Sequence, residues 1–116
     1  MKNAIILTVL LFVGLTVTAQ ETAQKKNKNA KYTVEVNGNC EQCKKRIEKA
    51  AYSVSGVKSA VWEIDSHMLG LIINEEKTNV GEVKKAIAKV GHDAGEVRAT
   101  DEDYNALHSC CLYQRK

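Results

Sequence analysis

The order in which apolar residues change their spacing constrains the fold of this chain more than any other feature. Alternating apolar and polar residues, which are typical of strands, recur over residues 31–36, 57–65, 69–74 and 94–99. Residues 40–54 and 80–90 instead carry apolar side chains three and four positions apart, which is typical of amphipathic helices. We therefore expect one small α+β domain with the order strand, helix, strand, strand, helix, strand.

This order is that of the split βαβ, or ferredoxin-like, arrangement. It predicts a βαββαβ sandwich with an antiparallel sheet in the strand order 4-1-3-2 and two helices on one face. Asn39 with Gln42, and Asn79 with Glu82, have the spacing of capping boxes and should begin the two helices. In this topology the fourth strand runs away from the loop that precedes the first helix. The C-terminal tail should therefore start at the opposite end of the domain.

The two ends of the chain differ in composition from the expected domain. Residues 1–19 resemble a secretory signal peptide, because Lys2 is followed by an apolar run and a small-residue ending. An uncleaved membrane anchor is the alternative interpretation. The expected division is a signal peptide over 1–19, a flexible linker over 20–30, the domain over 31–99 and a Cys-rich tail over 100–116, in which a short helix is one interpretation. After cleavage the protein would be periplasmic or secreted.

The cysteines carry the chemistry. The chain has four of them, Cys40, Cys43, Cys110 and Cys111. Thiolates are soft ligands that select Cu(I), Zn(II) and Hg(II) over hard cations. Their spacings would close almost no loop as disulfides and would stabilise little, so metal ligation by Cys40 and Cys43 is favoured over structural disulfides. A thiol–disulfide redox protein is a further alternative, disfavoured because the chain has no proline to face a thioredoxin-type site.

Other residues are candidates for auxiliary roles. His92 follows the second helix and should lie near the first cysteine pair, where an imidazole could complete three-coordinate copper. Cys110 and Cys111 are adjacent, and we expect neighbouring side chains to diverge rather than chelate one ion together. One of them would pair with Cys40 or Cys43, or bind metal with His108, while a disordered tail is the alternative.

A cluster of positive charge follows the cysteine pair directly. Lys44, Lys45 and Arg46 could offset the charge of a bis-thiolate complex or dock an acidic partner, although an ordinary solvated helix face would look the same. The net charge of the whole chain is +3, which does not indicate a nucleic-acid-binding protein. A protein-interaction module in which the thiols are incidental is therefore a competing hypothesis.

Several of these motifs occur together in one known family. The chain resembles the heavy-metal-associated domain family over about residues 31–99. The resemblance rests on Cys40-x-x-Cys43, Ile47-Glu48, Gly56-Val57, Ala86-Ile87 and Gly91-His92-Asp93-Ala94. The family usually has Gly-Met-x-Cys at the metal loop, whereas this chain has Asn37-Gly38-Asn39 and lacks the buried Met.

The resemblance implies a non-enzymatic metallochaperone or scavenger. Its cargo would be Cu(I), bound by Cys40 and Cys43 and passed on by stepwise thiolate exchange; Hg(II) capture is the alternative, and Zn(II) is also permitted. The implied partner is a metal-transporting ATPase or another metal-exchange protein, with no nucleic acid and no small-molecule substrate. We expect a monomer, with a metal-bridged dimer as the alternative.

Overall fold

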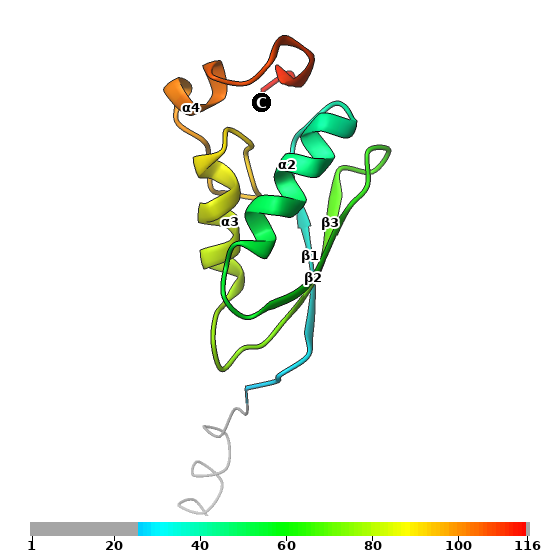
Figure 1. Cartoon of the computed structure of the whole chain (residues 1–116), viewed down its shortest axis with the longest axis vertical. Coiled ribbons are helices and arrows are strands. Elements are labelled where there is room, and N and C mark those ends of the chain that lie inside the picture. The colour runs from blue at the N-terminus through cyan, green and yellow to red at the C-terminus, as the bar shows by residue number, and fades with distance from the viewer. Residues whose placement is uncertain (1–25, 116) are drawn as a thin grey trace, which may run out of the picture.

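The computed structural model describes residues 26–115, which form a two-layer α+β domain with an appended C-terminal segment (Figure 1). One layer is an antiparallel sheet, and helices α2 and α3 cover one of its faces. The elements are β1 (Ala30–Glu35), α2 (Glu41–Tyr52), β2 (Val57–Trp62), β3 (Met68–Ile73), α3 (Val80–Lys89), α4 (Asp101–Asn105) and the 3₁₀ turn η2 (Ser109–Cys111). This architecture confirms the predicted ferredoxin-like class.

The sheet has the order β1-β3-β2, with β3 paired antiparallel to both neighbours. Alternation along β3 sends Leu69, Leu71 and Ile73 into the core beneath the helices. On β2 the same alternation buries Ala60 and Trp62. The central position of β3 explains why this strand is the richest in large aliphatic residues.

Each helix turns one apolar stripe toward the sheet. Helix α2 buries Cys43, Ile47, Ala50 and Ala51, and α3 buries Val83, Ile87 and Ala88. The predicted cap of α3 is confirmed, because the Asn79 side chain accepts a 3.0 Å hydrogen bond from the Glu82 backbone N–H. The cap predicted for α2 is wrong by one residue, since the N-cap is Cys40 and not Asn39.

The predicted fourth strand is not confirmed. Residues 94–99 begin to pair with the end of β1, through hydrogen bonds from Asn37 N–H to Asp93 O (3.0 Å) and from Gly95 N–H to Glu35 O (2.8 Å). The chain then reverses, because Ala94 and Val97 exchange backbone hydrogen bonds around Gly95, whose φ is +55°. The described sheet therefore has three strands, and the outer edge of β1 is paired with this segment only near its C-terminal end.

This early reversal also corrects the expected place of the tail. Because residues 94–99 do not cross the domain, α4 and η2 stay at the end where α2 begins (Figure 1). The tail therefore starts beside the first cysteine pair and not at the opposite end. The short helix that was one interpretation of the tail forms as α4, with the Thr100 side chain accepting a hydrogen bond from Asp103 N–H.

The predicted signal peptide and most of the predicted linker lie outside the described residues. Where the description begins, Asn27 already exchanges hydrogen bonds with Glu75, and β1 starts one residue before the predicted domain boundary. Within residues 26–115, every helix is too short or too polar to cross a bilayer.

Candidate metal centre

The cysteine pair lies at the first turn of α2. Cys40 caps the helix and is half-buried, while Cys43 follows in the first turn and is fully buried. Their sulfur atoms are 3.4 Å apart, and the Asn39 backbone N–H donates a 3.4 Å hydrogen bond to the Cys43 sulfur. A strand that ends and a helix that begins thus place two thiols side by side, next to the positive end of the helix dipole.

The floor of this loop is made by Trp62. Its indole N–H donates a 3.0 Å hydrogen bond to Val36 O, and its ring passes under Gly38. A Cβ at Gly38 would lie 3.1 Å from both Cys43 Cβ and the Trp62 ring. A larger residue there would require Cys43 or the Trp62 ring to shift, so Gly38 permits the close approach of the indole that fills the space beneath the loop.

The tail brings two further sulfur atoms to Cys40. The Cys40 sulfur is 3.7 Å from that of Cys110 and 3.6 Å from that of Cys111, and the latter two are 3.8 Å apart. The expectation that adjacent thiols diverge is wrong here, because the tight 3₁₀ turn η2 points both toward Cys40. All four cysteines are free thiols in the structure.

Polar side chains of α2 surround the sulfur atoms. Arg46 Nη1 donates to the Cys111 sulfur at 3.2 Å, and the Gln42 carbonyl accepts from the Cys110 thiol at 3.2 Å. Lys44 instead binds Trp62 O at 2.6 Å and pairs with Glu48 at 3.0 Å. Of the three basic residues predicted to lie beside the thiols, Arg46 contacts a sulfur atom, Lys44 links α2 to the end of β2 through Trp62 O, and Lys45 is exposed.

The thiols of Cys40, Cys43 and Cys110 differ in acidity. Burial raises the pKa of the Cys40 thiol, but the Cys43 backbone N–H and the neighbouring thiols together lower it to about 7. Burial raises the pKa of Cys43 to about 12. The hydrogen bond with Cys40 is the main cause that raises the pKa of Cys110 to about 11. Cys40 thus ionises before Cys43 and Cys110 and is better suited than either to begin ligation.

The two predicted histidines are not in the sulfur cluster. Among the described residues, the group of side chains spaced to hold an ion is Cys40, Cys110 and Cys111. His92 is fully buried; its Nδ1 lies 2.8 Å from Asn37 O, and its Nε2 has no hydrogen-bond partner in the described part of the chain. Burial lowers the pKa of His92, so this ring stays neutral at pH 7. His108 is exposed.

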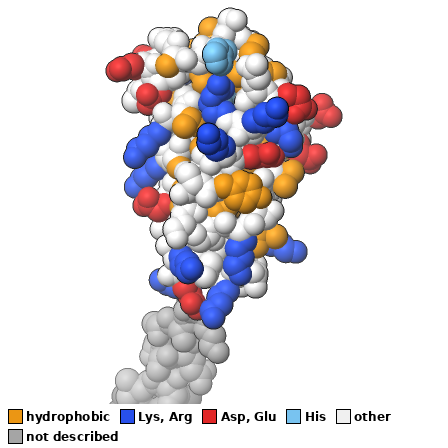
Figure 2. Space-filling view, in the orientation of Figure 1, with side chains coloured by type: hydrophobic (Ala, Val, Ile, Leu, Met, Phe, Trp, Pro, Cys, Tyr) orange, Lys and Arg blue, Asp and Glu red, His pale blue; other side chains and the backbone are white. Residues whose placement is uncertain are grey.

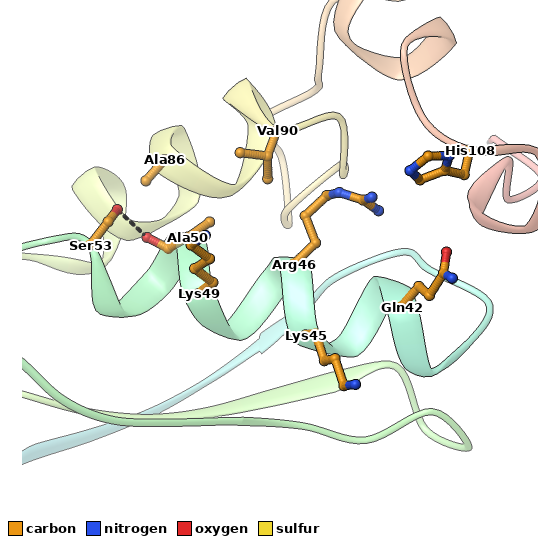
Figure 3. A pocket seen from close by; sticks show the side chains of 9 residues that line it. All are labelled: Gln42, Lys45, Arg46, Lys49, Ala50, Ser53, Ala86, Val90 and His108. Atoms are coloured by element: carbon orange, nitrogen blue, oxygen red, sulfur yellow. Dashed lines mark hydrogen bonds between the residues drawn. The ribbon is translucent and has the colours of Figure 1, made fainter.

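A groove of about 590 Å³ lies on the helical face, between α2, α3 and the start of the tail (Figure 3). Its floor is apolar, and Arg46 extends across it toward His108. The lining residues are Gln42, Lys45, Arg46, Lys49, Ala50, Ser53, Ala86, Val90 and His108. Figure 2 shows that Lys and Arg side chains gather over this helical face of the molecule. Because Gln42 and Arg46 also contact the tail thiols, the groove and the sulfur cluster form one continuous surface.

Two residues that hold the tail were not predicted. Tyr113 is buried, and its hydroxyl accepts from Asp93 N–H and donates to Gly91 O, each at 2.9 Å. Arg115 binds both carboxylate oxygens of Asp93, at 2.7 and 3.1 Å. The only sequence signal was an aromatic and a basic residue close behind a cysteine pair, which is too common to indicate docking.

Together the fold and the site define a small ferredoxin-like domain that presents thiols where a strand gives way to a helix. The model of the heavy-metal-associated domain matches residues 33–93, more than half of the chain. The chain therefore belongs to the heavy-metal-associated domain family and has a heavy-metal-binding domain. The comparison with curated proteins gives no match.

Solved structures with the same fold include metal-handling proteins. The CopZ metallochaperone is 27% identical, with a TM-score of 0.54, and the match covers 56% of this chain and 98% of CopZ. Oxidized MerP from Ralstonia metallidurans CH34 is 25% identical, with a TM-score of 0.55 and coverage of 58% and 94%. A copper-binding domain of the P-type ATPase HMA7 is 25% identical, with a TM-score of 0.54 and coverage of 55% and 88%. The family match ends before α4, so the tail thiols lie beyond it.

Proposed function

We propose that this protein is a carrier of a soft heavy-metal ion, with Cu(I) as its cargo, and not an enzyme. The observation that carries the proposal is the position of Cys40 and Cys43, 3.4 Å apart at the start of α2 in a heavy-metal-associated domain. Thiolates are the ligands that Cu(I) prefers. The likeness to a structure described as a metallochaperone supports the same role.

In the proposed mechanism, Cys40 captures the ion first because its pKa of about 7 leaves much of it ionised at neutral pH. Cys43 follows once the bound cation displaces its proton. The ion then leaves by ligand exchange, as a thiolate of the partner adds and those of this chain depart one at a time. Exchange of this kind needs no large conformational change in the domain.

The partner would be a metal-transporting ATPase or another metal-exchange protein. The exposed Lys45 and the groove beside it offer a cationic surface for an acidic partner, with Lys44 and Arg46 as further members of that surface. We further propose that the protein acts in the periplasm or outside the cell after removal of residues 1–19, as a monomer.

Competition with bicinchoninate under anaerobic conditions tests this function. The wild-type protein should retain one equivalent of Cu(I), and the Cys40→Ser/Cys43→Ser variant should release it to the chelator. Ser53→Ala, a substitution at the far end of α2, serves as the matched control and should retain Cu(I). Equal retention by the double variant and the wild type would refute the proposal.

Two other candidates rest on the same thiols. Hg(II) is as soft as Cu(I), so a mercury carrier predicts that Hg(II) displaces bound Cu(I) stoichiometrically and that Cu(I) is not the ion found after anaerobic purification. A redox protein is favoured only by the low pKa of Cys40, which suits a nucleophilic thiol. It predicts turnover in an insulin-reduction assay, which a metal carrier should not give.

A further inference from the structure

The three sulfur atoms of Cys40, Cys110 and Cys111 form a nearly equilateral triangle with edges of 3.6, 3.7 and 3.8 Å. With metal–sulfur bonds of about 2.3 Å, two ligands of a tetrahedral ion lie about 3.8 Å apart, and two ligands of a trigonal planar ion about 4.0 Å apart. The triangle therefore already has the size of a three-thiolate site.

The Cys40–Cys43 pair does not match its expected geometry as closely. A linear two-coordinate ion with the same bonds would separate the sulfur atoms by about 4.6 Å. The observed separation is 3.4 Å, so this pair must open before it can hold an ion linearly. Cys40 thus belongs to two sets of thiols, of which the set shared with the tail needs the smaller rearrangement.

The tail is held in place by contacts that do not involve sulfur. The Tyr113 ring stacks on His92 at 5.5 Å and meets Tyr104 edge-on at 4.9 Å, while its hydroxyl bridges Asp93 N–H and Gly91 O. Arg115 then closes the segment by its two hydrogen bonds to Asp93 and a third to Ala99 O at 2.7 Å. We call these contacts of Tyr113 and Arg115 the tail latch.

The tail latch fixes η2 from its C-terminal side, and the chain enters η2 through Leu107, which is buried against Gly91. With both ends held, the two thiols of η2 remain over Cys40. Arg46 lies 3.2 Å from the Cys111 sulfur and supplies a positive charge for the anionic complex that several thiolates form around a monovalent ion. The spacing of the sulfur atoms, the residues that hold both ends of η2 and the charge of Arg46 therefore all favour a metal ion at this position.

We propose that Cys110 and Cys111 are ligands of the transported ion, so that Cu(I) captured by Cys40 and Cys43 passes, with loss of Cys43, to a closed three-thiolate site of Cys40, Cys110 and Cys111. Each thiol gives its proton to solvent as its sulfur binds the ion. The tail is then both a cover and a source of ligands, and an accepting protein must displace it to reach the ion. The proposal rests on the proposed function, because it assumes that Cu(I) is the cargo.

X-ray absorption of the anaerobic full chain with one equivalent of Cu(I) tests the proposal. Copper should have three sulfur neighbours in the wild type and two in Cys110→Ser/Cys111→Ser. Bicinchoninate competition should show that the variant binds Cu(I) about 10- to 100-fold more weakly, at least the loss seen when a supporting group of a metal site is removed. Ser109→Ala, in the same turn, is the matched control and should keep three sulfur neighbours.

A second measurement needs no substitution and so does not depend on the folding of a variant. Cys110 is exposed, so N-ethylmaleimide at alkaline pH should alkylate it in the metal-free protein, more slowly than Cys40 because of its raised pKa. One equivalent of Cu(I) should block that reaction. Two sulfur neighbours in the wild type, or alkylation of Cys110 at the same rate with and without Cu(I), would overturn the proposal.

The two proposals fail in different ways. If Cys40→Ser/Cys43→Ser loses Cu(I) while Cys110 of the wild type stays reactive with Cu(I) bound, the carrier function stands and the tail is not a ligand. If the wild type binds no Cu(I), both proposals fall. Tyr113→Phe keeps all four thiols and weakens only the tail latch; it should retain three sulfur neighbours and bind Cu(I) more weakly than the wild type.

Discussion

The loop before α2 and the C-terminal tail both bring thiols to one point, but they are held there by different forces. Cys40 and Cys43 are placed by the backbone, since β1 ends and α2 begins within the same few residues. Cys110 and Cys111 are placed by side chains, through the contacts of Tyr113 and Arg115 with the segment after α3. The position of the first pair therefore depends on local backbone structure, while that of the second depends on contacts between residues far apart in the chain.

The largest effect is expected at Cys40, whose sulfur belongs both to the pair with Cys43 and to the triangle with the tail thiols. Cys40→Ser removes a ligand from both sets and should weaken Cu(I) binding by more than about 100-fold, beyond the loss expected for a supporting group. Cys43→Ser leaves the three-sulfur triangle intact and should have the smaller effect. Bicinchoninate competition on both variants measures the difference, with Ser109→Ala as the control. A larger loss in Cys43→Ser would mean that the tail thiols do not complete the site.

The ion pair of the tail latch should dominate the stability of the tail. Arg115→Ala leaves the Asp93 carboxylate buried, with 5% of its side chain exposed, and should cost about 3 kcal/mol. Asp101→Asn is the control, because Asp101 binds the same guanidinium at 3.1 Å but is 95% exposed and should change stability by less than about 1 kcal/mol. Urea unfolding measures both. Equal losses of unfolding free energy in the two variants would mean that the buried Arg115–Asp93 pair does not stabilise the tail.

The acidity of the two regions should differ in the metal-free protein. The pKa of Cys40 is about 7 and that of Cys110 about 11, so the thiolate of Cys40 appears at much lower pH. Cys40 has about a thousand times more thiolate than Cys110 at pH 8, but nucleophilicity falls with pKa, so the net advantage of Cys40 in alkylation should be about tenfold. Iodoacetamide labelling read by mass spectrometry across pH 6–11 gives both profiles. A shared midpoint would show that the thiols do not polarise one another.

The smallest expected effect concerns the loop alone. Gly38→Ala adds a methyl group 3.1 Å from Cys43 Cβ and from the Trp62 ring, and such overpacking costs about 1–3 kcal/mol. The tail latch should be unaffected, so Cys111 should remain as protected from alkylation as in the wild type. Gly70→Ala is the control, since its nearest neighbour is 3.8 Å away. Thermal unfolding measures the cost, and no difference between the two variants would place the Trp62 ring elsewhere.

Much of the fold could be predicted because its signals are local. The alternation in β1, β2 and β3 and the helical spacing in α2 and α3 each lie within a short stretch of chain. Asn79 was recognisable as a cap because its partner is three residues away. The cap of α2 was misplaced by one residue, since Asn39 has the right side chain but the backbone turns at Cys40. The position of Cys40 and Cys43 at the start of α2 was predicted for the same local reason.

By itself, the sequence determined the βαββα core, the family and the position of the Cys-x-x-Cys loop, because residues close along the chain fix a strand end and a helix start. Only the tertiary structure decided that residues 94–99 turn back instead of crossing the sheet, and that Cys110 and Cys111 face Cys40. Those outcomes depend on contacts across long stretches of chain, such as Tyr113 with Gly91 and Arg115 with Asp93. Periodicity carries no information about such contacts, since each depends on where the rest of the fold places its partner.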